Sequence, residues 1–133
     1  MAQLVLPRVQ AMMLCDGVEE SDEESGVFHL TGVRTVVRAS AFPAMCPRLC
    51  AFVQMSGHRG KALCHIEIER LGTDEYIHHT KPKEIFFDEP VSVVPVLFRM
   101  RNCVFPAAGI YYVQIVTESK LIGERPLELR QED

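Results

Sequence analysis

The sequence predicts an all-β protein: a single antiparallel β-sandwich with Greek-key connections, immunoglobulin-like or C2-like, of seven to nine strands. Short runs rich in β-branched and aromatic residues recur along the chain, separated by glycine, proline and polar turn residues. No window of more than a few residues spaces its apolar positions as an amphipathic helix would. A chain of 133 residues suits one domain, which we expect to span 1–133.

The chain is organised around a predicted C-terminal hairpin at 109–129. Its first half is rich in β-branched and aromatic residues, as a central strand is. Pro126 in its second half cannot donate to a ladder, which indicates an edge strand or a bulge. Alternate residues of the first half fall on two largely apolar faces. One face holds Tyr111, Val113 and Ile115, and the other holds Ile110, Tyr112, Gln114 and Val116.

Tyr111 lies where a corner tyrosine would lie. In Greek-key sandwiches a tyrosine at the start of a central strand bonds through its hydroxyl to upstream backbone. Pro106 and Gly109 precede Tyr111 in this pattern. The alternative is that Tyr111 is an ordinary core aromatic.

Seven further segments have strand character. Within them Gly32 predicts a bulge, and 57–60 predicts a four-residue hairpin turn. The segment 39–47 is expected to be a packed connection. The cleanest alternation, in 61–69, directs Ala62, Cys64, Ile66 and Ile68 inward. The predicted strands are 8–15, 27–38, 49–56, 61–69, 76–78, 85–87 and 91–101.

The formal charge of −4 is unevenly distributed. Six of the 18 acidic residues lie within nine positions, 16–24, which leaves 12 acids against 14 lysines and arginines elsewhere. We interpret 16–26 as a solvated acidic loop. A nearly neutral body argues against nucleic-acid binding. A calcium site would need a second loop, such as Asp74-Glu75 or Asp88-Glu89, because the loop lacks EF-hand spacing.

The five cysteines, at 15, 46, 50, 64 and 103, predict reduced, mostly buried thiols in a cytoplasmic protein. Cys46 and Cys50 have loose zinc-ligand spacing, and Cys64, His65 and Cys103 could complete a tetrahedron. Inward cysteines more often behave as small hydrophobes, so we predict no metal and no cofactor. The N-terminal segment 1–14 does not read as a signal peptide, and no apolar run is long enough to span a membrane.

No nucleophile, phosphate-loop or paired-carboxylate motif specifies an enzyme, and surface positions are the default for all five histidines. We therefore predict a non-enzymatic binding or assembly module acting through protein contacts. The alternative is a calcium- or zinc-binding domain or an enzymatic domain, with a site that no motif reveals. The face formed by Ile110, Tyr112, Gln114 and Val116 is apolar enough to bury a partner, and we expect a homodimer or a protein partner there.

Several motifs together resemble a family of short uncharacterised bacterial proteins, classed as a domain of unknown function. The resemblance spans nearly the whole chain and implies an immunoglobulin-like or similar β-sandwich with no assigned activity. It implies no catalytic residues. Its motifs mark turns and strand starts: Cys15-Asp16-x-Val18, Leu30-Thr31-Gly32-Val33, Phe42-Pro43 and Phe105-Pro106-x-x-Gly109-x-Tyr111.

Overall fold

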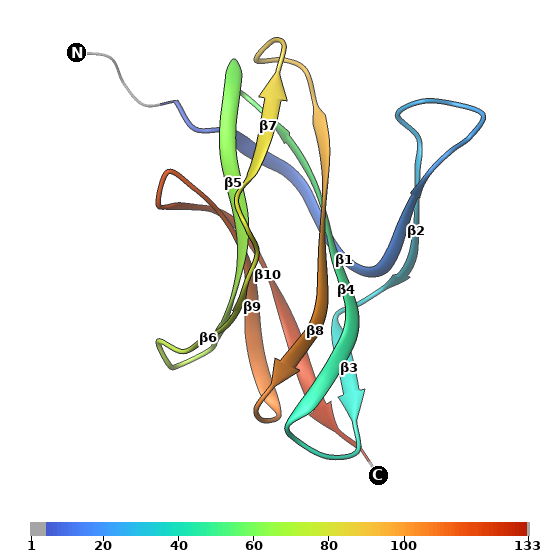
Figure 1. The fold of residues 1–133 in the computed structure, drawn as a ribbon, viewed down its shortest axis with the longest axis vertical. Helices are drawn as coiled ribbons and strands as arrows, with labels where there is room; N and C mark the ends of the chain where they lie inside the picture. The colour runs from blue at the N-terminus through green and yellow to red at the C-terminus, as the bar shows by residue number, and fades with distance from the viewer. Residues whose placement is uncertain (1–4, 133) are drawn as a thin grey trace.

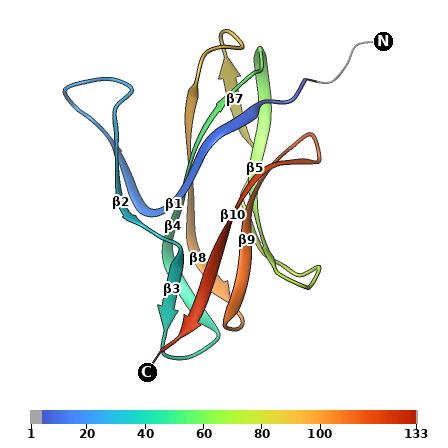
Figure 2. The same ribbon diagram turned by 180° about the vertical axis from the view of Figure 1, so that it is seen from behind.

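The computed structural model describes residues 5–132, which form ten strands in two facing sheets and contain no helix (Figures 1 and 2). No membrane-spanning helix therefore occurs in this part of the chain. The four-stranded sheet contains β1 (Arg8–Glu20), β2 (Phe28–Val33), β4 (Ala44–Ser56) and β8 (Val94–Phe105). The six-stranded sheet contains β3 (Val36–Ala39), β5 (Gly60–Arg70), β6 (Tyr76–His79), β7 (Lys83–Phe87), β9 (Gly109–Thr117) and β10 (Lys120–Gln131).

The predicted all-β sandwich is confirmed. The four-stranded sheet has the order β2-β1-β4-β8, and the six-stranded sheet has the order β3-β10-β9-β5-β6, with β7 also paired to β5. Every ladder is antiparallel except that between β3 and β10, which is parallel. The strand count of seven to nine was wrong, because the expected strand 27–38 is two strands.

That strand divides because its two ends pair with different sheets. β2 pairs with β1, whereas β3 pairs with the end of β10 in the other sheet. Gly32 has a φ of 64°, a left-handed conformation that only glycine adopts cheaply, but the ladder keeps its register across it, because Thr31 pairs with Gly17 and Val33 pairs with Cys15. The predicted bulge at Gly32 was therefore wrong, and the chain leaves the first ladder after Val33, where β2 ends.

The prediction of a loop over 16–26 was wrong in its first half. β1 continues to Glu20 and pairs with β2 as far as Glu20 opposite Phe28. The clustered charge led to the prediction of a loop. In an exposed two-stranded arm, however, alternate carboxylates can stay in water while the backbone groups remain paired in the ladder. The arm formed by β1 and β2, residues 16–33, extends beyond the body of the sandwich (Figure 1).

Two connections also differ from the prediction. β4 begins at Ala44, inside the expected connection 39–47, because Ala44 pairs with Phe105 of β8. The turn at 57–60 has positive φ at Gly57 and Gly60, as a tight turn requires, but it joins β4 to β5 in the other sheet. It is therefore a crossover between the two sheets and not a hairpin.

The core lies between the two sheets, and the alternation of β5 supplies part of it as predicted. Ala62, Cys64, Ile66 and Ile68 are all buried. Fully burying one large aliphatic side chain contributes roughly 1.5–3 kcal/mol. Residues from β1, β4, β8, β9 and β10 complete the same apolar cluster, so the sandwich is held together chiefly by packing between sheets.

The C-terminal hairpin is confirmed as β9 and β10, with Glu118 and Ser119 at its tip, both at positive φ. Its bulge lies between Leu121 and Gly123. Pro126 pairs with Tyr112 of β9, and β3 joins the other side of β10 only from Glu128 onward. Pro126 therefore occupies a stretch where β10 has one ladder partner, which agrees with the edge interpretation.

Tyr111 forms the predicted corner. Its side chain is fully buried, and its hydroxyl donates to the Ala107 carbonyl oxygen at 2.7 Å. Its ring packs edge-on against Phe105, with 5.0 Å between ring centroids. The corner ties the β8–β9 connection to the start of the central strand.

We expect Tyr111→Phe to lower the free energy of unfolding by about 1 kcal/mol, since it removes the bond from the hydroxyl to the Ala107 carbonyl and the longer one, at 3.4 Å, that the hydroxyl accepts from the Ala107 N–H, and leaves the ring in place. Urea denaturation measures this. Tyr112→Phe is the matched control and should change stability by a few tenths of a kcal/mol at most. Equal effects of the two substitutions would contradict the assignment of the corner.

Candidate functional site, an arginine-lined pocket

The predicted contact face on β9 is less open than its sequence indicates. Gln114 and Val116 are only 9% and 8% exposed, and Ile110 and Tyr112 are half-buried. The Gln114 amide donates to the carboxylates of Glu69 and Glu124 at 3.2 and 3.3 Å. Glutamate side chains therefore border the few apolar atoms that this face exposes. Its role as a dimer contact stays a prediction.

The cysteines are buried and free, as predicted, but the zinc candidates do not converge. Cys46 pairs across the ladder with Cys103, Cys50 pairs with Cys15, and Cys64 lies in the other sheet. Within residues 5–132, no three His, Cys, Asp or Glu side chains are grouped closely enough to hold a metal ion.

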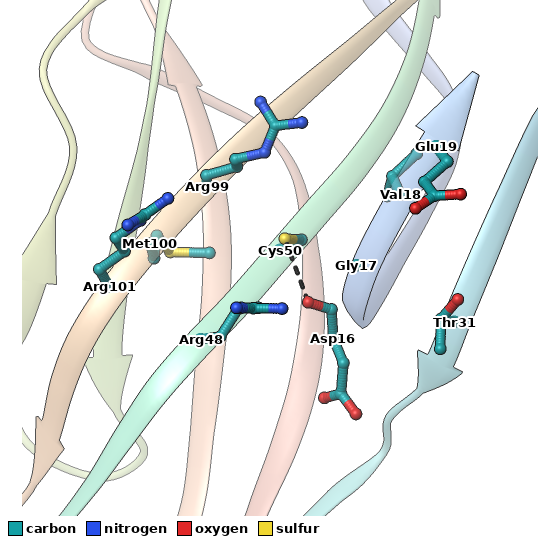
Figure 3. Close-up of a pocket in the computed structure, with 10 residues that line it drawn as sticks. All are labelled: Asp16, Gly17, Val18, Glu19, Thr31, Arg48, Cys50, Arg99, Met100 and Arg101. Atoms are coloured by element: carbon teal, nitrogen blue, oxygen red, sulfur yellow. Dashed lines mark hydrogen bonds between the residues drawn. The ribbon is translucent and has the colours of Figure 1, made fainter.

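A pocket of about 440 Å³ lies between β4, β8 and the base of the β1–β2 arm. Its basic wall consists of Arg48, Arg99 and Arg101 (Figure 3). These side chains are on the outer face of the four-stranded sheet, because their chain neighbours Leu49 and Met100 are buried in the core. The other lining residues are Asp16, Gly17, Val18, Glu19, Thr31, Cys50 and Met100.

The strand register brings the three arginines together. Arg48 lies directly opposite Arg101 on the neighbouring strand, and Cys50 lies opposite Arg99. Like charges directly opposite in an antiparallel pair are destabilising. Among the described residues, none of the three forms an ion pair or a side-chain hydrogen bond with another residue. The cluster therefore weakens the fold locally and offers guanidinium donors to an anion.

The thiol of Cys50 forms part of the pocket floor. Burial raises its pKa, while Arg99, Arg48 and Arg101 act in the opposite direction through their positive charge. All three guanidinium groups are thus close enough to influence one buried atom. The net effect is a raised pKa, so Cys50 is a neutral thiol near pH 7 and lacks the thiolate character of a catalytic nucleophile.

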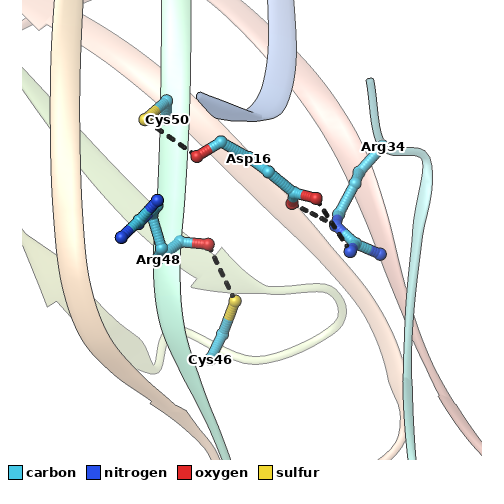
Figure 4. Close-up of polar contacts among 5 residues, drawn as sticks. All are labelled: Asp16, Arg34, Cys46, Arg48 and Cys50. Carbon is cyan, nitrogen blue, oxygen red and sulfur yellow. Dashed lines mark hydrogen bonds and ion pairs between the residues drawn. The ribbon is translucent and has the colours of Figure 1, made fainter. Parts of the chain in front are cut away.

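Asp16 lines the pocket next to the arginines and forms an ion pair with Arg34, which lies outside the pocket (Figure 4). Asp16 accepts from Nε and Nη2 of Arg34, the latter at 3.0 Å, in a two-point contact. The backbone carbonyl of Asp16 also accepts a weak bond from the Cys50 thiol at 3.6 Å. Asp16 therefore joins the arm to the sheet, and because its carboxylate is engaged by Arg34, it does not neutralise Arg48.

Gly32 leaves room for the Asp16 carboxylate. A Cβ atom at position 32 would lie 2.3 Å from Oδ2 of Asp16. No side chain larger than hydrogen fits there unless the Asp16 carboxylate moves. The left-handed φ of Gly32 and the Asp16 contact thus impose the same requirement for glycine.

Basic residues continue beyond the pocket on both sides. A neighbouring hollow of about 710 Å³ shares Arg48 and Arg101 with the pocket and adds Arg34 and Arg38. On the other side, Lys81 and Lys83 line a hollow of about 300 Å³ next to Arg99. The amine of Lys83 already donates one hydrogen bond, to the Leu97 carbonyl at 2.8 Å, so it is less available to a ligand.

The sequence alone did not predict this site. Arg48 falls between the expected connection 39–47 and the expected strand 49–56, and 16–26 was expected to be a separate solvated loop. The detectable signal was the alternation of arginines with apolar residues in β8. The missing step was the pairing of β4 with β8, which depends on contacts between residues about 50 positions apart.

Three solved structures are similar to this chain. One is the alkylpurine DNA glycosylase AlkC of Pseudomonas fluorescens, bound to DNA with an abasic-site analogue (TM-score 0.60, 10% identity, 93% of this chain, 30% of that one). A second is a β-glucosidase of Listeria innocua (TM-score 0.54, 8% identity, covering 96% of this chain and 16% of that one). A third, with a TM-score of 0.43, is an immunoglobulin-like protein of Pseudomonas aeruginosa (15% identity, covering 94% of this chain and 97% of that one).

The first two likenesses show the fold alone, and this chain spans less than a third of either enzyme. No curated protein matches the chain. One family profile matches residues 10–130, which include β2 to β9 and most of β1 and β10. The chain therefore belongs to DUF6941, a family of unknown function.

Proposed function

We propose that this domain is a non-enzymatic, cytoplasmic binding module that recognises a carboxylate-rich protein segment through its arginine-lined pocket. The observation that carries the proposal is the set of three arginines on neighbouring strands. Arg48 faces Arg101 across the ladder with no acidic partner among the described residues. Guanidinium groups bind carboxylates at two points, and several of them can follow an extended acidic segment.

The chemistry of the pocket favours binding over catalysis. Burial raises the pKa of the Cys50 thiol, and no histidine lines the pocket to activate this thiol or the Thr31 hydroxyl as a base. Five free thiols support the cytoplasmic setting.

Nucleic acid is the other polyanion to weigh, because the Pseudomonas fluorescens glycosylase was solved bound to DNA. The pocket has no aromatic side chain on which a base could stack. The formal charge of −4 and the carboxylate of Glu19 repel any anion, and they repel the continuous charge of a nucleic-acid backbone more than that of a short acidic segment. We therefore propose no nucleic-acid partner.

The proposal predicts that a fluorescein-labelled octaglutamate peptide binds the wild-type protein and that Arg48→Gln/Arg99→Gln/Arg101→Gln weakens binding at least roughly tenfold, about 1.4 kcal/mol. Fluorescence anisotropy measures both affinities. Binding should also weaken as salt is added, since the contacts are exposed.

The matched control neutralises three exposed cations outside the pocket, Arg8, Arg59 and Lys120. It has the same net charge as the pocket variant and should bind the peptide within about twofold of wild type. Equal losses in the two variants would refute a specific site. Tighter binding of a labelled oligonucleotide than of the peptide would assign the pocket to nucleic acid.

A further inference from the structure

The tip of the β1–β2 arm presents acidic side chains that the domain itself does not use. Asp22, Glu23 and Glu24 are exposed, and among residues 5–132 none of them forms an ion pair. Exposed Val27 completes the tip. By contrast, Asp16 is engaged by Arg34, and Glu20 accepts the Gly26 backbone N–H at 2.9 Å.

The tip is an ordered turn. Ser21 donates its backbone N–H to the Val27 carbonyl at 2.7 Å. The Ser21 hydroxyl oxygen accepts the backbone N–H groups of Glu23 and Glu24 at 3.2 and 3.3 Å. These bonds hold the acidic side chains in a fixed turn at the end of a paired arm. Binding the tip therefore costs less ordering entropy than binding a disordered acidic segment.

The arm cannot insert this tip into its own pocket. Gly17 and Glu19 line the pocket, and the β1–β2 ladder continues past them to Glu20 opposite Phe28. At about 3.3 Å per strand residue, the tip lies roughly 15–20 Å beyond the Asp16 end of the pocket. Folding back would break the ladder. The pocket and the tip are therefore complementary in charge and separated along one rigid arm.

We propose that two copies of this chain exchange arms, the acidic tip of each entering the arginine-lined pocket of the other. A two-fold axis between antiparallel arms makes both contacts at once, because each arm carries a tip at one end and a pocket at its base. Arm exchange makes a second copy of the chain the source of the carboxylate-rich segment, and the inference therefore rests on the proposed function. Arg48, Arg99 and Arg101 meet Asp22, Glu23 and Glu24 in each half of the dimer.

Two charge-reversed variants test the exchange. One carries Asp22→Lys, Glu23→Lys and Glu24→Lys; the other carries Arg48→Glu, Arg99→Glu and Arg101→Glu. Analytical ultracentrifugation at low salt should show the wild type at twice the 15.0 kDa of one chain and each variant alone as a monomer. In about 1 M salt, where the Debye length is about 3 Å, the wild type should also dissociate.

Mixing the two variants gives the decisive result. In a mixed dimer the lysine tip of one chain meets the glutamate pocket of the other, and the wild-type tip meets the wild-type pocket. Both contacts are attractive, so an equimolar mixture should form heterodimers. A mixture that stays monomeric would overturn the proposal, as would variants that each dimerise like the wild type.

A matched control reverses three exposed acids elsewhere, Asp74, Glu75 and Glu89, and should leave the dimer intact. Loss of the dimer in Tyr112→Glu with retention in the pocket variant would move the contact to the β9 face and overturn arm exchange. A wild type that is monomeric and still binds octaglutamate would overturn the exchange and leave the proposed function standing. Absence of peptide binding in a monomeric protein would remove both.

Discussion

Tyr111→Glu should yield almost no folded protein. The Tyr111 side chain is fully buried between the sheets, packed on Phe105, and its hydroxyl is bonded to Ala107. The substitution removes a large aromatic side chain, which costs about 3–5 kcal/mol, and buries a carboxylate with no partner, which costs several kcal/mol more. Because the free energy of unfolding of a domain is only roughly 5–15 kcal/mol, the combined cost is enough to unfold most of the protein. Circular dichroism and soluble yield measure the outcome.

Tyr112→Glu is the matched substitution one residue along. Tyr112 is half-buried on the outer face of β9, opposite Glu69 on one side and Pro126 on the other. A glutamate there faces like charge across the ladder, which costs at most about 1 kcal/mol, so the domain should fold. Folded Tyr111→Glu, or unfolded Tyr112→Glu, would show that the two faces of β9 have been assigned the wrong way round.

Gly32→Ala should lower the free energy of unfolding by about 2–3 kcal/mol. Holding alanine in the left-handed region costs about 1 kcal/mol, and the added Cβ would lie 2.3 Å from Oδ2 of Asp16. The carboxylate must move, which weakens its two-point contact with Arg34. Urea denaturation measures the loss.

Two comparisons separate strain from the Asp16 contact. Gly26 has a similar φ of 83° but nothing within 4 Å of an added Cβ, so Gly26→Ala should cost only about 1 kcal/mol. In an Asp16→Ala background, Gly32→Ala should cost less than in the wild type, because the contacts with Oδ2 and Cγ at 2.3 and 2.8 Å are removed and only the one with Cβ at 3.2 Å remains. Equal costs for Gly32→Ala in the two backgrounds would disprove the contact.

The elements that the sequence predicts well are those in which local pattern and final environment agree. One face of β5 is buried and the other is in contact with solvent, so apolar and polar residues alternate along its sequence. Tyr111 and the turn glycines at 57 and 60 have conformational roles that depend on nearby residues alone. These features need no knowledge of which strand pairs with which.

The candidate site could not be predicted in the same way. Arg48 and Arg101 are 53 positions apart and meet only because β4 pairs with β8. Asp16 to Glu20 was expected to be loop because six acids cluster at 16–24, but pairing with β2 outweighed their charge. Val36 and Val37 continued the predicted strand 27–38, yet their partners are Glu128 and Leu129 in the other sheet. Each error concerns the pairing of strands, which periodicity does not encode.

Thermal unfolding with and without octaglutamate tests most directly whether the arginines serve recognition and not folding. At a protein concentration where both proteins are monomeric, we predict that Arg48→Gln/Arg99→Gln/Arg101→Gln melts at or above the wild-type temperature, because the opposed charges of Arg48 and Arg101 are removed. We also predict that peptide at a hundredfold excess over Kd stabilises the wild type by about 2.7 kcal/mol and leaves the variant unchanged. A variant that melts well below wild type, or that gains the same stability from the peptide, would contradict the account.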